Sequence, residues 1–324
     1  MFLYIVIRLG QGALLLLAMS VLVFVAIYAI GNPITMLVNP SSPQEVIDET
    51  VRRLGLDQPL YIQYLRFLAQ AVQGNLGVSY ISSQPALRLI VERFPATLEL
   101  TLTAMTIASV IGIPLGLVAG YRPNSPLGRA IGTISIIGIS LPSFWIGLML
   151  ITIFSIRFGI LPTGGRGQTA SILGFESSLF TRDGWSHIVM PAINLCFFPM
   201  AMIIRLTRAG VRENITSNHI RYARAKGLSG TRILFGYILP SISIPLITVL
   251  GIVFGVLLAF GVVTETVFAW PGIGKLIIEA IRTGDRPIII AYLLFTVLLF
   301  ALINLAVDIL CAVIDPRISL SGAR

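Results

Sequence analysis

The sequence predicts an all-α protein that crosses a membrane six times. Hydrophobic residues make up 56% of the 324 residues and charged residues only 11%, against about 25% charged residues in a typical soluble domain. The mean hydropathy is +0.90. Six uncharged apolar runs each approach the roughly 20 residues that a helix needs to cross a bilayer. A basic segment separates the fourth run from the fifth.

The predicted spans follow directly from these runs. They comprise residues 9–30, 100–121, 130–156, 188–204, 240–264 and 288–310. A charge at the centre of a span costs about 2.5–3.5 kcal/mol, and no run has one near its centre. Arg8 precedes the first run, as in a signal peptide, but the run is long and no clear cleavage site follows it. We therefore expect an uncleaved first span.

The distribution of charge sets the expected orientation. With residues 1–8 inside, the inner side also receives the loop 122–129, the segment 205–239 and the tail 311–324. Twelve basic residues then lie on this side against three acidic ones, namely Glu213, Asp315 and Asp308 at the inner end of the last span, which accounts for the whole net charge of +9. Because basic residues concentrate on the cytoplasmic side of membrane proteins, both termini are expected there. The positive charge therefore describes topology and does not indicate a nucleic-acid partner.

The outer segment 31–99 is too long for a simple connector and predicts a small helical cap. Residues 42–45 read Ser-Pro-Gln-Glu, a typical helix start with a capping serine and a proline at the first position. Apolar residues at helical spacing indicate a second helix over 61–72. A third short helix is expected over 86–94, at the membrane interface and ended by Pro95. A shorter outer loop is expected over 265–287.

Two spans carry residues that shape helices. Gly112, Gly116 and Gly120 recur every four residues in the second span, and small residues at this spacing let helix backbones approach closely. They indicate helix packing, either within the chain or between subunits. Pro142 interrupts the third span and permits a bend, which is either a moving part or a static kink.

The segment 205–239 holds seven basic residues and one acid, Glu213. Helix-forming residues continue up to Gly227, the pair Ser229-Gly230 favours a turn, and a new apolar run begins at Leu239-Pro240. This pattern predicts two helices joined by a turn. The alternative is a basic loop that sets topology and contacts anionic lipid.

No catalytic residue and no metal site are expected. Gly272-Ile273-Gly274-Lys275 has some likeness to a phosphate-binding loop, but Ala269 replaces the first glycine and Leu276 follows the lysine. His187 and His219 lie outside the middle of the spans, so no Ser–His pair is expected to meet within the bilayer. The chain is therefore expected to have no enzymatic activity of its own.

Thiols and acids in or near the spans receive structural interpretations. Cys196 and Cys311 lie in apolar runs without metal or redox spacing, and we expect buried, unreactive thiols. Glu99, Glu265 and Asp308 lie near span ends, where we expect them at the membrane interface. An acid deep in a span would indicate proton coupling, and its absence argues against an ion-coupled carrier. Asn194 and Asn304 either join helices or line a path.

Residues 221–240 resemble the signature loop of ABC importer permeases, which reads Glu-Ala-Ala, three residues, Gly, nine residues and Ile-x-Leu-Pro. Ala223, Gly227 and Leu239-Pro240 match this pattern. Three positions depart from it, namely Arg221, Tyr222 and Tyr237. Other segments are similar to one branch of the family, the first permease subunit of dipeptide, oligopeptide and nickel importers. These segments are Leu54–Leu60, Arg93–Leu100, Ser140–Trp145, Glu265–Gly274 and Asp315–Ile318. Gly31-Asn32-Pro33 departs, because the branch usually has an acid before the proline.

The resemblance covers nearly the whole chain and implies a type I ABC importer permease fold, with one permease domain over about residues 75–310. It also implies a coupling helix that docks on a cytoplasmic ATPase. Its expected residues are Arg221, Tyr222, Ala223, Arg224, Ala225, Lys226, Gly227 and Leu228. The implied partners are a second, non-identical permease subunit, two ABC ATPase subunits and an extracytoplasmic substrate-binding protein. ATP and Mg²⁺ would bind to the ATPases, and no cofactor is expected in this chain.

The expected function is therefore the permease subunit of an importer for di- or oligopeptides in the inner membrane of a bacterium. Nickel, glutathione or oligosaccharide is the alternative cargo within the same family. A secondary carrier without an ATPase is the alternative from another class. The sequence does not identify the substrate, because much of the selectivity in such systems lies in the binding protein.

Overall fold

The structure, a computed structural model, describes residues 2–29, 43–45, 48, 52, 57–172 and 175–314. The cap helix predicted from residues 42–45 lies largely outside this part of the chain, as do Gly31-Asn32-Pro33 and Asp315–Ile318. The chain divides into two compact units. The first comprises residues 1–5, 95–275 and 303–324, and the second comprises residues 6–94 and 276–302.

The second unit joins the N-terminal helix to the short helix that follows it. Helix α1 spans Phe2–Ala29 and α4 spans Leu60–Val72, which confirms the helix predicted over 61–72. The hydroxyls of Ser20 and Tyr64 are hydrogen-bonded at 2.9 Å, and the rings of Phe24 and Tyr64 meet edge to face at 5.3 Å between centroids. These contacts hold α4 against α1.

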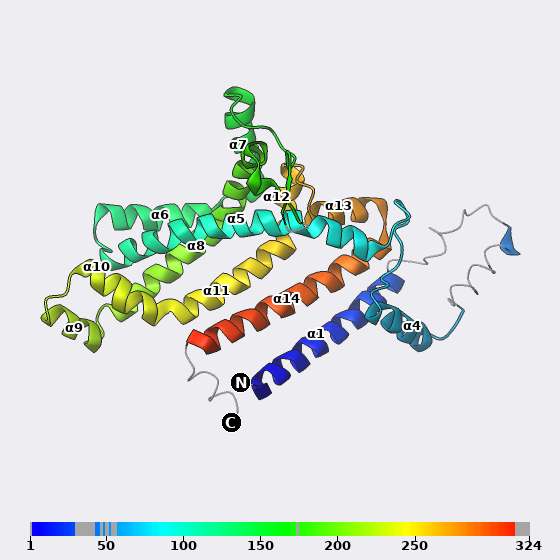
Figure 1. The fold of residues 1–324 in the computed structure, drawn as a ribbon, viewed down its shortest axis with the longest axis horizontal. Helices are drawn as coiled ribbons and strands as arrows, with labels where there is room; N and C mark the ends of the chain where they lie inside the picture. The colour runs from blue at the N-terminus through cyan, green and yellow to red at the C-terminus, as the bar shows by residue number, and fades with distance from the viewer. Residues whose placement is uncertain are drawn as a thin grey trace. The chain divides into compact units, whose positions relative to one another are not determined.

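The remainder of the described chain is mostly helical (Figure 1). Its first half contains α5 (Ala86–Tyr121), α6 (Pro126–Ser140), α7 (Ser143–Leu150), the π-helix η1 (Ile151–Arg157), the antiparallel hairpin β1 (Ala170–Ile172) and β2 (Phe175–Ser177), and the 3-10 turn η2 (Ser178–Phe180). Its second half contains α8 (Arg182–Asn214), α9 (Asn218–Ala225), α10 (Gly230–Ile233), the π-helix η3 (Leu234–Ile238), α11 (Leu239–Phe260), α12 (Val262–Val267), α13 (Ile273–Thr283) and α14 (Arg286–Ile314).

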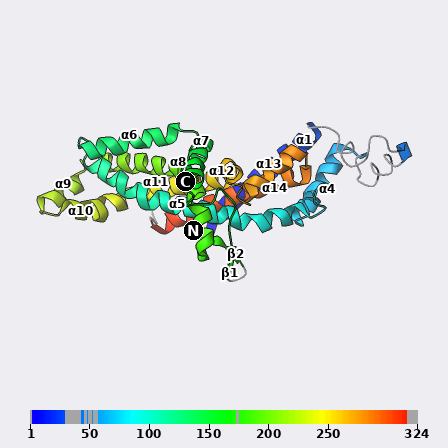
Figure 2. The same cartoon turned by 90° about the horizontal axis from the view of Figure 1, so that it is seen from above.

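Helix α8 is the central helix of the first unit. It packs against α6, α7, α11 and α12, and more of it is buried than of any other candidate span. One end, at Arg182, adjoins the hairpin β1–β2 and is called the hairpin end below. The other end, at Asn214, leads into α9 and is called the α9 end (Figure 2).

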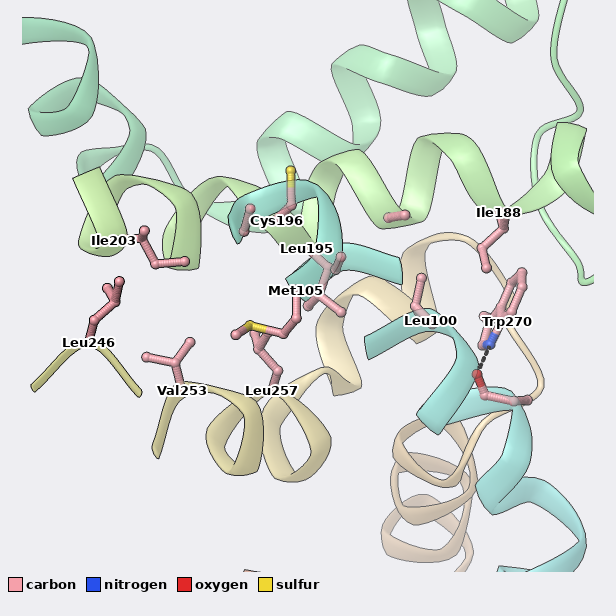
Figure 3. Close-up of a cluster of buried hydrophobic side chains, with 14 residues drawn as sticks. Leu100, Met105, Ile188, Leu195, Cys196, Ile203, Leu246, Val253, Leu257 and Trp270 are labelled. Carbon is pink, nitrogen blue, oxygen red and sulfur yellow. Dashed lines mark hydrogen bonds between the residues drawn. The ribbon is translucent and has the colours of Figure 1, made fainter. Parts of the chain in front are cut away.

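A buried apolar core lies between α5, α8 and α11 (Figure 3). Leu100 and Met105 come from α5, while Ile188 comes from α8 and Leu257 from α11. The indole N–H of Trp270 donates a hydrogen bond of 2.9 Å to the carbonyl oxygen of Ala96. The core therefore fixes both the long helices and the segment that follows α12.

In the part of the chain that the structure describes, five helices are long and apolar enough to cross a membrane, and six if α6 and α7–η1 together make one span. The five include α1, α5, α8 and α14, and a continuous run from α10 to α11. The axes of α6 and α7–η1 differ by 102°. The bend falls at Leu141-Pro142, where Leu141 is extended with ψ of 130°, because proline disfavours a helical residue before it.

Pro95 does not end a helix, and this expectation was wrong. Helix α5 continues from Ala86 through Pro95 to Tyr121. A proline inside a helix costs one hydrogen bond but keeps a helical φ angle. Buried side chains on both sides of it, Ile90 at 0% and Ala96 at 2% exposure, favour the continuous helix over a break.

Candidate functional site

The short helix α9 lies at the centre of the basic segment and ends at a left-handed glycine. Gly227 has φ of +75°. Its N–H donates to the carbonyl of Arg224 at 2.9 Å, and the N–H of Leu228 donates to the carbonyl of Ala223 at 3.3 Å. This is the Schellman arrangement, which satisfies the last carbonyls of a helix and reverses the chain. Gly227 therefore sets the angle between α9 and the chain that follows it.

One face of α9 is held by apolar packing. Ile220 and Ala223 are buried at 0% and 2% exposure. They belong to a core cluster with residues at the neighbouring ends of α5, α8, α10, η3 and α11, and Leu228 packs against the same cluster. The cluster is Leu117, Val211, Ile220, Ala223, Ile233, Ile238 and Ile242. The position of α9 relative to the long helices is thus fixed by burial.

The other face of α9 is exposed and positively charged. Arg221, Arg224 and Lys226 are all exposed, and Tyr222 keeps 64% of its surface exposed. The Lys226 ammonium lies 4.5 Å from the centroid of the Tyr222 ring. Among the described residues, no carboxylate forms an ion pair with these cations. The face therefore has charge and aromatic surface available to a partner.

The remaining residues expected in the coupling helix divide between the two faces. Ala225 and Gly227 are exposed, whereas Leu228 is half-buried. The guanidinium of Arg224 also lies 6.0 Å from the centroid of the Tyr121 ring at the end of α5. The structure thus gathers the eight residues on one short helix and its C-terminal turn.

The three glycines of the second span lie along the contact of α5 with α8. A Cβ at Gly112 would lie 3.1 Å from Ile203 Cγ2, and one at Gly116 would lie 2.5 Å from Thr207 Cβ. A Cβ at Gly120 would lie 2.6 Å from Val211 Cβ. The backbones are therefore too close for larger side chains at Gly116 and Gly120 unless the helices move apart.

Glu99 lies near the hairpin end of α8 and is bound on both carboxylate oxygens. Its Oε1 accepts hydrogen bonds from the backbone N–H groups of Ser178 at 2.9 Å and Leu179 at 3.1 Å, and from the Ser178 hydroxyl. Its Oε2 accepts from Nη2 of Arg166 at 2.5 Å. Arg166 also donates to the carbonyl of Glu176 at 2.6 Å. Glu99 thus ties α5 to the hairpin and to η2.

Glu265 forms a second buried carboxylate centre. Its Oε1 accepts from the Thr97 hydroxyl at 2.6 Å, and its Oε2 accepts from the N–H of Lys275 at 2.9 Å. The Thr97 hydroxyl in turn accepts from the N–H of Ile273 at 2.9 Å. Burial raises the pKa of the Glu265 carboxyl above its usual value, while these hydrogen bonds oppose the rise. A Cβ at Gly272 would lie 2.3 Å from Oε1, so only glycine fits there.

Glu99 and Glu265 lie near span ends, as expected, but the sequence did not predict that both are buried. Their exposed fractions are only 7% and 1%. Each carboxylate accepts at least one hydrogen bond from a segment far away in the sequence, which periodicity does not place beside it. One signal was present, since Thr97 and Glu99 share one of the family-like segments and Glu265 begins another.

A small cavity of about 270 Å³ lies between α6, α7, α8 and the α11–α12 turn. Asn194 and Thr264 line it, and the Asn194 amide donates to the Thr264 hydroxyl at 2.9 Å. The Asn194 Oδ1 atom is buried without a hydrogen-bond partner among the described residues. Phe198 and Phe260 supply apolar walls. Asn194 therefore joins two helices and also presents a polar atom at this cavity.

Comparison with known proteins identifies the family of the chain. Residues 112–320 match the family described as binding-protein-dependent transport system inner membrane component, and residues 1–101 match the N-terminal family of the same membrane components. The glutathione transport system permease protein GsiC of Escherichia coli O6:H1 is 38% identical over 304 residues, which are 94% of each chain. The di/tripeptide transport system permease protein DppB of Pseudomonas aeruginosa is 38% identical over 327 residues, covering 96% of this chain and 97% of that protein.

A solved structure shows the same fold at lower identity. The inward-facing MetNI methionine ABC transporter contains a chain that matches with a TM-score of 0.59. The match covers 72% of this chain and 99% of that chain, at 20% sequence identity. The fold is that of a type I importer permease. The chain belongs to the binding-protein-dependent transport system inner membrane components, as an ABC importer permease of the dipeptide and oligopeptide branch.

Proposed function

We propose that this chain forms part of the translocation path for di- or oligopeptides and couples that path to cytoplasmic ATPases through α9. The observation that carries the proposal is the two-sided construction of α9. Its inner face packs into the core through Ile220 and Ala223, while its outer face is exposed. A force applied to such a helix is transmitted to α5, α8 and α11 because all three contribute to the same packed cluster.

The chemistry of the exposed face indicates the kind of groove that would receive it. Arg221, Arg224 and Lys226 favour carboxylates in the partner, and the Tyr222 ring favours an apolar slot. Ala225 presents little bulk and permits close approach. An ATPase groove with an apolar floor and acidic rims therefore fits this face.

The assembly that follows contains this chain, a second and non-identical permease subunit, two ABC ATPases and an extracytoplasmic binding protein. Nucleotide and Mg²⁺ would bind to the ATPases, since the segment Gly272–Lys275 lacks the phosphate-loop pattern. The charge distribution supports an orientation with both termini in the cytoplasm of a bacterium and the chain in its inner membrane. The α9 end of α8 is then cytoplasmic.

The relatives support two cargo classes. DppB is described as a di/tripeptide permease and GsiC as a glutathione permease, and glutathione is itself a small peptide. Nickel and oligosaccharide are alternatives within the family. A secondary carrier lacks support, because Glu99 and Glu265 are tied into structural hydrogen bonds and lie near span ends.

The test is affinity purification of the tagged full chain in mild detergent, with identification of the proteins that accompany it. We expect a second permease and ATPase subunits. Ala225→Trp should remove the ATPases, because the bulky ring would occupy the exposed face of α9. Ala130→Trp, on an exposed position of α6, is the matched control and should retain them. A chain that purifies alone under several gentle conditions would favour the secondary carrier.

A further inference from the structure

Three arginines form a single row along the exposed side of α8. Arg205, Arg208 and Arg212 are separated by three and four residues, the spacing that places side chains on one helix face. The row covers about 10 Å along the helix axis, at a rise of about 1.5 Å per residue. It occupies the α9 end of the helix. We refer to these three residues as the arginine row.

The direction of the arginine row is fixed by packing on the opposite side of α8. Ile203, Thr207 and Val211 are buried at 3% exposure or less, and they lie against the glycines of α5. Because the three buried residues and the three arginines lie on different sides of the same turns, α8 cannot rotate the arginines into the core without exposing the buried residues. Arg205 and Arg212 are therefore exposed, and Arg208 is half-buried beside Gly132 of α6.

The charges of the arginine row are not balanced by nearby acids. In the part of the chain that the structure describes, none of the three guanidinium groups forms an ion pair with a carboxylate. Glu213 lies four residues after Ala209 and lines a cavity toward α11 with Leu206 and Ala209, and no ion pair joins it to the row among the described residues. Arg129, one turn before Gly132 on α6, adds further positive charge. Like charges at this spacing repel each other, so the row favours binding of an anion.

The surface around the arginine row is apolar. A shallow groove of about 470 Å³ is lined by Met202, Leu206 and Ala209 together with the three arginines. Farther into the span, Met202 and Phe198 leave 39% and 44% of their surfaces exposed. Charge at the end of the span and apolar surface deeper within it match the two parts of a phospholipid, its headgroup and its acyl chain.

The rule that places basic residues inside explains the sign of these charges but not their alignment. Orientation depends on the number of basic residues near the ends of spans, and any position in a loop would serve. The arginine row instead lies on the span helix itself, where its groove is continuous with apolar surface. We propose that the row binds the phosphate of an anionic phospholipid from the cytoplasmic leaflet.

The test compares lipid retention by the full chain with matched charge losses. The probe is phosphatidylglycerol mixed with phosphatidylcholine in nanodiscs or mild detergent, and retained lipid is counted by native mass spectrometry. Arg205→Gln with Arg212→Gln leaves the Arg208 contact with α6 unchanged. Arg122→Gln with Arg232→Gln removes the same charge from exposed positions of the inner loop and of α10. Arg205→Lys with Arg212→Lys keeps the charge in the row.

We expect the glutamine pair in the row to lower the preference for phosphatidylglycerol on the order of tenfold, since each basic residue near an anionic surface contributes about a severalfold gain in binding. The lysine pair and the control pair should retain the preference. Equal retention by the row variant and the wild type overturns the proposal, even where solute uptake falls, because the row then serves the transported solute. An equal loss in the control pair also overturns it, because general surface charge then explains binding.

Discussion

At its α9 end, the first unit exposes a set of cations, whereas near the hairpin end it buries two carboxylates. Arg221, Arg224 and Lys226 are exposed on a helix whose other face is apolar. Glu99 and Glu265 are instead enclosed by backbone N–H groups, hydroxyls and, for Glu99, a guanidinium group. The same kind of sequence feature, a charge beside an apolar run, thus has two opposite structural outcomes.

The difference teaches how position determines the use of a charge. A buried carboxylate that has hydrogen-bond donors stabilises the segments that supply them, and its loss leaves those donors unpaired. An exposed cation adds little to stability but remains available to a partner. Substitutions near the hairpin end should therefore change stability, and substitutions on α9 should change coupling. Four variants test this contrast, from the largest expected loss of stability to the smallest.

Arg166→Gln should have the largest effect on stability. The change leaves the Glu99 carboxylate buried without its guanidinium partner, which we expect to cost about 3 kcal/mol. The free energy of unfolding is measured by denaturant titration in mild detergent. Arg88→Gln is the control, because its ion pair with Glu92 is mostly exposed and should contribute less than about 1 kcal/mol. Equal losses in both variants would contradict the role of burial.

Thr97→Val should destabilise the Glu265 centre with little change in side-chain shape. Without the hydroxyl, Glu265 Oε1 loses a donor and the N–H of Ile273 loses its acceptor, for a loss of about 2 kcal/mol. The unfolding temperature measures the change, with the folded fraction after heating read from size-exclusion chromatography. Thr106→Val provides the comparison, since that exposed hydroxyl donates to the carbonyl of Leu102 in its own helix. If both valine variants unfold at the same temperature, the Thr97 hydroxyl does not stabilise the Glu265 centre.

Gly227→Val should lower the free energy of unfolding by about 1–2 kcal/mol through backbone strain at a left-handed residue. No steric clash adds to this strain, because nothing lies within 4 Å of the added Cβ. We expect membrane insertion to persist while uptake by the assembled transporter falls, since α9 loses its terminal turn. Uptake into proteoliposomes and ATP hydrolysis are the measurements. Gly227→Asn should behave nearly as the wild type, because asparagine tolerates this backbone conformation. Normal uptake by the valine variant would refute the role of the turn in coupling.

Tyr222→Ala should leave stability within about 0.5 kcal/mol of the wild type, as expected for an exposed side chain. Recovery of ATPase subunits with the tagged chain should nevertheless decrease, because the ring is the main aromatic surface on α9. Tyr61→Ala is a matched control, since Tyr61 on α4 is 66% exposed and Tyr222 is 64% exposed. The contrast would fail if both variants retained the ATPases equally, or if Tyr222→Ala unfolded the chain.

Features that depend on neighbouring residues could be predicted from the sequence. The long apolar helices follow from uncharged runs, because burying a charge in lipid costs more than a helix can recover. The end of α9 at Gly227 follows from the low cost of a left-handed glycine. The family itself was also predicted correctly, because several segments of its pattern occur in the right order.

Only the tertiary structure decided which distant residues meet. The sequence places Glu99 and Ser178 far apart, and Thr97 and Glu265 still farther, yet each pair is joined by hydrogen bonds. Local patterns instead suggested acids at the membrane interface and a helix ended by Pro95. Long-range packing buried the acids and kept the helix continuous through Pro95, because a carboxylate with enough donors can leave water and a proline can remain in a helix that is packed on both sides. The sequence alone determined the spans and the terminal turn of α9, and long-range packing determined where the charges lie.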